Sequence, residues 1–348
     1  MSFTLSYRQK RYKKVAAYST LGETVGKNDT LKFAVILQQG RQARRFRNMS
    51  KLQYIEIFKQ WNFTAFWTSL FAYKLADNLF TVGLFWWILK ATASEETLGI
   101  VGTLSFIPMF IFGLFSGAIT DRFDQKKLLA TSALARSMLI PIIPLLHYLG
   151  ILEIWHVYLI TFIQGISSTF FVVASSAIVP QLVPKESLMA ANSLVDASAW
   201  TGNIIGFLAA GILVDSFGAM NLLAMTLFLL LASALTMALI KSPPKITAAY
   251  VSAKTILGDL AKGLKAIKKD KAVFTFITTW MGIQMLFAGG PMSIGWPVFS
   301  EKVLRAGPEG YGLLVMAISV SALIGSFVIG QLARNKNKGI TIMIGRMT

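Results

Sequence analysis

One acidic residue interrupts the first long apolar stretch of the chain. Asp77 lies midway along residues 64–89, and Lys74 stands about one helical turn before it. If the stretch crosses a membrane, an acid at this depth costs about 2.5–3.5 kcal/mol and must face a cavity or a partner. An acid in such surroundings takes up a proton more readily than it does in water. Asp77 is therefore a candidate proton carrier with Lys74 as its partner, and a static Lys74–Asp77 ion pair is the alternative.

A second group of charges, GAITDRFDQKK at residues 117–127, follows a long uncharged run. A glycine at 117 would let a neighbouring helix approach, and an acid at 121 could then accept from the N-terminal amides of that helix. We expect these residues to form a latch between helices, although charges where a helix meets headgroup water are also ordinary. The candidate latch residues are Gly117, Asp121, Arg122, Lys126 and Lys127.

Glycines at four-residue spacing mark a possible site of close helix packing. In GNIIGFLAAG, Gly202 and Gly206 share one helical face and Gly211 follows. Small residues at this spacing let two helix backbones approach closely in a membrane. A generic close contact without a role in transport is the alternative.

Aromatic and methionine residues are frequent in the first and seventh apolar stretches, as in WMGIQMLFAGGPM. Soft, adaptable side chains suit the binding of varied hydrophobic ligands. Trp280, Met281 and Met285 are therefore candidates for lining a substrate cavity. Helices that face lipid use the same residue types, which is the alternative interpretation.

The composition indicates a membrane protein. Of 348 residues, 54% are hydrophobic and 14% are charged, whereas soluble domains carry about 25% charged residues; the mean hydropathy is +0.59. The absence of cysteine excludes disulfides, thiolate metal sites and cysteine nucleophiles, and two histidines argue against an imidazole metal cluster. No G-x-x-x-x-G-K-[ST] motif for ATP occurs. We expect no enzyme activity, no metal and no cofactor.

Eight runs reach the roughly 20 apolar residues that a spanning helix needs. They are residues 64–89, 97–119, 127–149, 153–178, 190–213, 219–240, 273–298 and 310–332. A ninth run begins at Gly339, and the sequence ends at Thr348 before the run could cross a membrane. The pattern predicts an all-α polytopic protein with a six-helix bundle at 49–240. A partial second bundle at 273–348 then holds two helices and the start of a third.

Basic residues account for the net charge of +18, and their positions favour lipid over nucleic acid as the partner. They gather in residues 1–48 and in alternate loops, whereas the other loops hold only Lys90, Lys302 and Arg305. The positive-inside rule then predicts a multi-pass protein of the inner, cytoplasmic membrane with a cytoplasmic N-terminus.

Two segments are expected to lie outside the helical bundles. Residues 1–48 are basic and precede a natural start at Met49, so we expect a disordered or loosely helical extension, with an organellar targeting peptide as the alternative. In the cytoplasmic linker at 241–272, leucines at helical spacing oppose lysines, which predicts an amphipathic segment along the membrane surface. A solvated charged linker is the alternative.

The charged stretch resembles the loop signature of the major facilitator superfamily, G-x-x-x-D-R/K-x-G-R/K-R/K. Gly117, Asp121, Arg122 and Lys126 match and Lys127 follows directly, whereas Asp124 and Gln125 stand where a glycine and a base are usual. The glycine cluster is similar to the antiporter motif of that superfamily, G-x-x-x-G-P-x-x-G-G, with Phe207 and Ala210 as departures.

The segments at 75–80 and 179–196 resemble the macrolide-efflux branch of the drug:proton antiporters in that superfamily. The resemblance covers residues 49–348 and implies major-facilitator-type helical bundles that work as a secondary active transporter. It implies proton-coupled export of a small hydrophobic solute, such as a macrolide or a siderophore-like compound. Because the second bundle is incomplete in this sequence, the alternative is a truncated, transport-inactive membrane protein that acts at most as an interaction partner.

Overall fold

The computed structural model describes residues 54–241 and 291–332, with shorter pieces at 258, 265, 267–271, 274–275 and 278–279. The chain divides into two compact units, Met1–Glu56 and Ile57–Thr348, and every helix named below lies in the second. The predicted extension at 1–48 and most of the predicted linker at 241–272 lie outside the described residues. Both assignments therefore stay predictions.

All regular structure in the described ranges is helical. The elements are α3 (Trp61–Thr92), α4 (Glu95–Thr120), α5 (Gln125–Leu139), α6 (Ile142–Tyr148), α7 (Ile154–Leu182), η1 (Lys185–Ser187), α8 (Leu188–Phe217), α9 (Ala219–Ala238), α12 (Pro291–Val298), η3 (Phe299–Val303) and α13 (Gly307–Leu332). Six spans are long and apolar enough to cross a membrane: α4, α5 with α6, α7, η1 with α8, α9 and α13. They coincide with six of the eight predicted runs, which confirms the all-α membrane fold.

The remaining two predicted runs differ from these six. α3 covers the run at 64–89 and has 32 residues, but its apolar sequence is interrupted by Lys74, Asp77 and Asn78. It is therefore not among the six most apolar spans. The run at 273–298 is described only in part, and its end forms α12.

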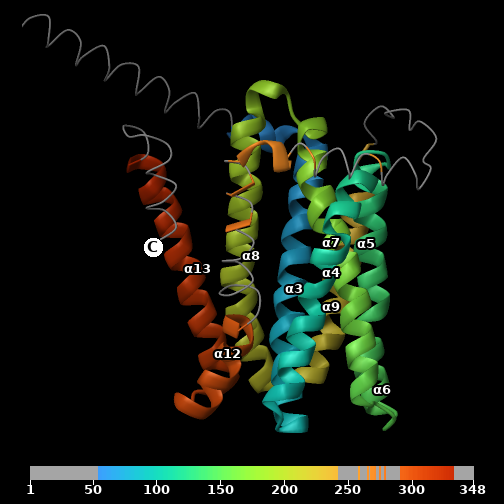
Figure 1. Ribbon diagram of the computed structural model, residues 1–348, viewed down its shortest axis with the longest axis vertical. Helices are drawn as coiled ribbons and strands as arrows, with labels where there is room; N and C mark the ends of the chain where they lie inside the picture. The colour runs from blue at the N-terminus through green and yellow to red at the C-terminus, as the bar shows by residue number, and fades with distance from the viewer. Residues whose placement is uncertain are drawn as a thin grey trace, which may run out of the picture. The chain divides into compact units, whose positions relative to one another are not determined.

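α3 occupies the centre of the bundle, where it packs along α8 and α9 (Figure 1). α4 packs on α7, and α5 packs on both α7 and α9. The largest core cluster joins apolar side chains from α3 and all of these neighbours. α13 lies along α8, so α8 separates α13 from most of the core.

The third predicted run, at 127–149, forms two helices rather than one. α5 ends at Leu139 and α6 begins at Ile142, with Pro141 between them at the N-cap of α6. Proline has no backbone N–H to donate to the preceding turn, and its ring clashes with the carbonyl group four residues earlier. The interruption follows Arg136 by about one turn.

The turn between α4 and α5 explains both departures from the loop signature. Asp124 is the N-cap of α5, and its Oδ1 accepts from the backbone N–H groups of Lys126 at 3.0 Å and Lys127 at 3.4 Å. The Gln125 side chain is buried, donates to the carbonyl of Thr120 at 2.7 Å and accepts from Gln181 of α7 at 3.0 Å. Both residues therefore join the ends of helices.

Asp124→Ala is expected to weaken the start of α5 by about 0.5–2 kcal/mol, because two amide groups lose their acceptor. Hydrogen exchange at the amides of Lys126 and Lys127 should become faster by a corresponding factor. Asp121→Ala is the matched control, since Asp121 caps no N-terminus in the described residues. Equal exchange rates in the two variants would show that Asp124 does not cap the helix.

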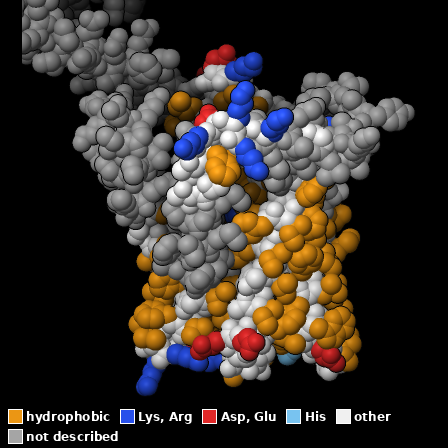
Figure 2. Space-filling view, in the orientation of Figure 1, with side chains coloured by type: hydrophobic (Ala, Val, Ile, Leu, Met, Phe, Trp, Pro, Cys, Tyr) orange, Lys and Arg blue, Asp and Glu red, His pale blue; other side chains and the backbone are white. Residues whose placement is uncertain are grey.

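The visible surface has the pattern of a protein that lies in a membrane. Figure 2 shows hydrophobic side chains over the middle of the molecule, with Lys and Arg gathered at one end. The opposite end carries Asp and Glu together with a smaller group of bases, and some acids also lie at the first end. We name the first, where α4 ends and α5 begins, the basic end, and the second, where α3 ends and α4 begins, the far end.

Candidate functional site

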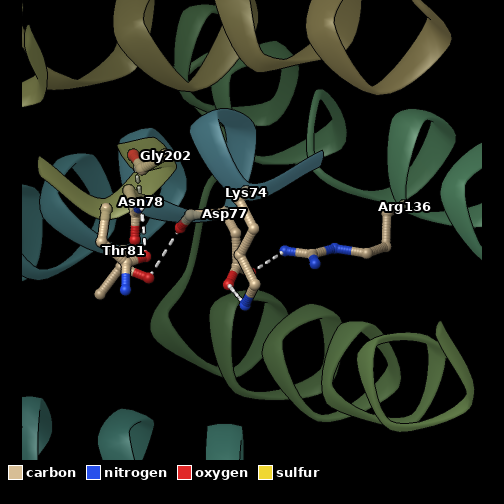
Figure 3. A network of polar contacts seen from close by, with 7 residues as sticks. Lys74, Asp77, Asn78, Thr81, Arg136 and Gly202 are labelled. Atoms are coloured by element: carbon tan, nitrogen blue, oxygen red, sulfur yellow. Dashed lines mark hydrogen bonds and ion pairs between the residues drawn. The ribbon is translucent and has the colours of Figure 1, made fainter. Parts of the chain in front are cut away.

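Asp77 lies between two cations near the middle of α3. Arg136 reaches across from α5, and its Nη2 donates to Asp77 Oδ1 at 2.7 Å (Figure 3). Lys74 Nζ lies 3.7 Å from the other carboxylate oxygen, Oδ2. The predicted Lys74–Asp77 pair is thus the longer of two ion pairs. The shorter one ties α3 to α5.

Arg136 is completely enclosed, with 0% of its surface exposed. Its guanidinium carbon lies 4.6 Å from the ring centroid of Tyr73, which stacks on Phe171 of α7. The Gln164 amide, turned so that its oxygen faces the guanidinium, accepts from Arg136 Nε at 3.2 Å. Asp77 offers this buried cation a carboxylate within the bundle.

The residue after Asp77 contacts a different helix. Asn78 is 5% exposed, and its Nδ2 donates to the carbonyl of Gly202 and to Oδ1 of Asn203, both at 3.1 Å. Thr81 Oγ1 donates to the carbonyl of Asp77 at 2.8 Å within α3 (Figure 3). Neighbouring positions of α3 thus bind α5 on one side and α8 on the other.

The two glycines of α8 at four-residue spacing lie directly against this part of α3. A Cβ added at Gly202 would lie 3.0 Å from the Cβ of Lys74. A Cβ added at Gly206 would lie 2.8 Å from the Cβ of Asn78. Both distances are shorter than ordinary van der Waals contact, so only glycine fits α8 at this separation from α3.

Gly211 packs on α13 and therefore on a different partner from the other two glycines. A Cβ added there would lie 2.7 Å from the carbonyl oxygen of Pro308. Conversely, a Cβ added at Gly312 of α13 would lie 2.6 Å from the carbonyl oxygen of Phe207. α8 thus uses one face for α3 and another for α13, and both contacts bring backbones close together.

Two ion pairs join α3 and α4 to η3 at the far end. Lys90 donates to Glu301, and Lys302 donates to Glu95. Lys90 also lies 5.5 Å from the ring centroid of Trp86. Glu301 and Lys302 carry opposite charges. Glu301 therefore pairs with a base of α3, and Lys302 pairs with an acid of α4. Together with the contact between Gly211 of α8 and α13, these pairs hold η3 and α13 against the six-helix bundle at the far end.

The candidate latch residues are not brought together with the Asp77 cluster. Asp121 is exposed at the end of α4 and makes no side-chain hydrogen bond or ion pair within the described part of the chain. A Cβ added at Gly117 would meet nothing within 4 Å. Neither residue therefore contacts a neighbouring helix here in the way that a latch requires. Arg122, Lys126 and Lys127 lie in the same turn at the basic end.

Three further candidates, Trp280, Met281 and Met285, lie outside the described residues. Sequence reasoning also missed two members of the cluster, the partner role of Arg136 and the polar contact of Asn78. The available signals were a single base inside an otherwise apolar run and an amide next to an intramembrane acid.

Comparisons with known proteins agree on the family. The family model described as Major Facilitator Superfamily matches residues 66–348. Macrolide efflux protein A of Streptococcus pyogenes is 20% identical over 278 residues, which are 79% of this chain and 68% of that protein. Enterobactin exporter EntS of Salmonella typhimurium is 26% identical over 275 residues, 73% of this chain and 59% of that protein.

Solved structures with the same fold include two transporters, each 15% identical in sequence to this chain. The first is a bacterial homologue of the human lysosomal transporter Spinster, in an inward-facing and unoccupied conformation. It has a TM-score of 0.59, with 81% of this chain and 62% of that chain covered. The second is a D-xylose-proton symporter with a TM-score of 0.54, with 80% of this chain and 69% of that chain covered. With most of its length matched by the family model and its helices arranged as in these transporters, the chain belongs to the Major Facilitator Superfamily, a family of multi-pass membrane transporters rather than enzymes.

Proposed function

We propose that the protein exports small hydrophobic compounds, such as macrolides or siderophore-like molecules, in exchange for protons, and that Asp77 carries the proton. The names of the macrolide efflux and enterobactin export relatives support the direction and the two solute classes. The observation that carries the proposal is the carboxylate of Asp77 within the bundle, paired with both Arg136 and Lys74. An intramembrane acid with such partners is typical of proton pathways in transporters.

Protonation of Asp77 and its ion pair with Arg136 compete with each other. The neutral acid no longer balances the enclosed guanidinium, so binding a proton weakens the contact that ties α3 to α5. One charge that moves through 100 mV releases about 2.3 kcal/mol. At about 1.4 kcal/mol per tenfold, this could hold a neutral solute at a gradient of order fifty. No nucleotide is then required as an energy source.

We further propose that the basic end faces the cytoplasm and that the protein lies in the inner membrane. The gathering of Lys and Arg at that end supports this orientation, because cytoplasmic loops carry the excess of bases. The latch at 117–127 remains part of the proposal: Asp121 is exposed at the basic end and accessible to the N-terminus of another helix. Trp280, Met281 and Met285 are proposed to line the solute cavity.

The proposal is tested by accumulation of a radiolabelled macrolide and of enterobactin in bacteria that lack their own exporters. Cells that express the protein should accumulate less of at least one compound, and a protonophore should abolish the difference. Asp77→Asn, which can still accept from Arg136, should remove export while the protein remains in the membrane. Thr81→Val is the matched control, because among the described contacts its hydroxyl bonds within α3.

Two results count against the proposal in different ways. Unchanged accumulation of both compounds would contradict the assignment of these solute classes. Export that continues at the same rate in Asp77→Asn would show that another group carries the proton.

A further inference from the structure

Asn78 forms a polar contact between α3 and α8 immediately after the proposed proton carrier. Both hydrogen bonds of its amide nitrogen go to α8, to the backbone carbonyl of Gly202 and to the side chain of Asn203. A side-chain amide inside a helical bundle is costly unless it is paired. These hydrogen bonds therefore fix one position of α3 relative to α8, which the surrounding apolar packing does not do.

The glycines of α8 fit this amide closely. A Cβ at Gly206 would lie 2.8 Å from both the Cβ and the Nδ2 of Asn78. The Cβ of Asn78 is fixed to the backbone of α3. If α3 slides or rotates at this point, it therefore has to displace α8 as well. The contact therefore transmits displacement between the two helices rather than absorbing it.

α8 makes the second half of the connection. Its Phe207 and Gly211 approach the backbone of α13 at Gly312 and Pro308. Tyr311 of α13 is 2% exposed and packs in a cluster with apolar side chains of α3 and α8. A displacement of α8 would consequently also displace α13.

We propose that Asn78 is a positioning residue that couples α3 to α8, so that loss of the Asp77–Arg136 ion pair moves α8 against α13. Consecutive residues of a helix point about 100° apart, so α3 holds α5 through Asp77 and α8 through Asn78. When the hold on α5 is released, α3 is free to shift and the amide carries α8 with it. This inference rests on the proposed function, because it takes Asp77 as the group that changes charge.

The groups that face Asp77 define what else could respond to pH. Within α3 they are Lys74 and Tyr73, and from α5 the group is Arg136. α7 contributes the amide of Gln164, and α8 contributes only amide and backbone groups at Asn78 in the described contacts. Among these groups, Asp77 is the carboxylate, and it is the group whose change of charge the inference uses.

The test uses the absence of native cysteine. Phe217 of α8 and Leu313 of α13 are each about half exposed. Cysteines at these two positions in the full chain, each carrying a nitroxide spin label, report the separation of the two elements by pulsed electron spin resonance. The distance distribution is recorded in detergent micelles from mildly acidic to mildly alkaline pH, without any solute.

The expected result is a pH-dependent ratio of short to long distances, changing about fivefold or more, the lower end of typical coupling between sites. Asn78→Leu keeps the branched shape and removes both hydrogen bonds. In this variant the pH-dependent change in the ratio of short to long distances should fall below about twofold. The short distance between the labels should still be present in the distribution. Thr81→Val, on the same helix, should respond as the parent does.

The outcomes separate this inference from the proposed function. A full pH response in Asn78→Leu overturns the coupling role of Asn78 and leaves the proton carrier intact. A full response in Asp77→Asn, or none in the parent, overturns the proton carrier and the inference together. If Asn78→Leu fails to fold, Asn203→Leu removes one of the two acceptors, and an undiminished response in that variant also overturns the inference.

Discussion

Asp77→Leu is expected to lower the free energy of unfolding by about 3–5 kcal/mol, because it leaves a buried charge without its partner. Arg136 has no exposed surface, and an arginine does not lose its proton within a protein. Its remaining neighbours, the ring of Tyr73 and the amide of Gln164, carry no negative charge. Denaturant unfolding of the purified protein in detergent micelles measures the loss.

Arg136→Leu is expected to cost less than Asp77→Leu. The Asp77 side chain is 27% exposed, keeps Lys74 at 3.7 Å, and can take up a proton when the guanidinium is gone. The double variant should be more stable than Asp77→Leu alone, because neither charge is then left buried. Glu95→Gln, at an exposed pair, is the control and should change stability by no more than about 1 kcal/mol. A double variant as unstable as Asp77→Leu would show that the ion pair is not the cause.

The spanning helices could be predicted from the sequence because hydrocarbon requires long apolar segments. Six described spans coincide with predicted runs. The break at Pro141 was not predicted, and proline alone does not mark one, because α4 and α7 continue past Pro108 and Pro180. The length and composition of the helices do not indicate which of them become neighbours. The packing of α3 on α9 and of α13 on α8 could therefore not be predicted.

The same limit explains which parts of the site were predicted. Lys74 and Asp77 are three residues apart on one helix, so helical geometry alone brings them close. Arg136 lies 59 residues from Asp77 in the chain, and only the packing of α3 against its neighbours makes the two meet. Glycine spacing likewise predicts a close approach but does not identify the partner, which is α3 for Gly202 and α13 for Gly211.

Gly206→Ala is expected to destabilise the protein and to stop export. The added Cβ would lie 2.8 Å from the Cβ of Asn78, an atom fixed to the backbone, so α8 must move away from α3. Overpacking of this kind costs about 1–3 kcal/mol, against a gain of about 0.5–1 kcal/mol for alanine over glycine in a helix. The shift also lengthens the bonds from Asn78 to Gly202 and Asn203. The macrolide accumulation assay and denaturant unfolding measure the two effects.

Gly99→Ala is the matched control, because a Cβ added at this position in α4 meets nothing within 4 Å. It should gain about 0.5–1 kcal/mol of stability from the smaller backbone entropy of the unfolded chain, with export unchanged. The contrast separates the general effect of alanine in a helix from the contact of Gly206 with Asn78. If both variants gain stability and both export at the parental rate, α8 can move away from α3 without consequence. The close approach of the two helices would then be ordinary packing with no role in transport.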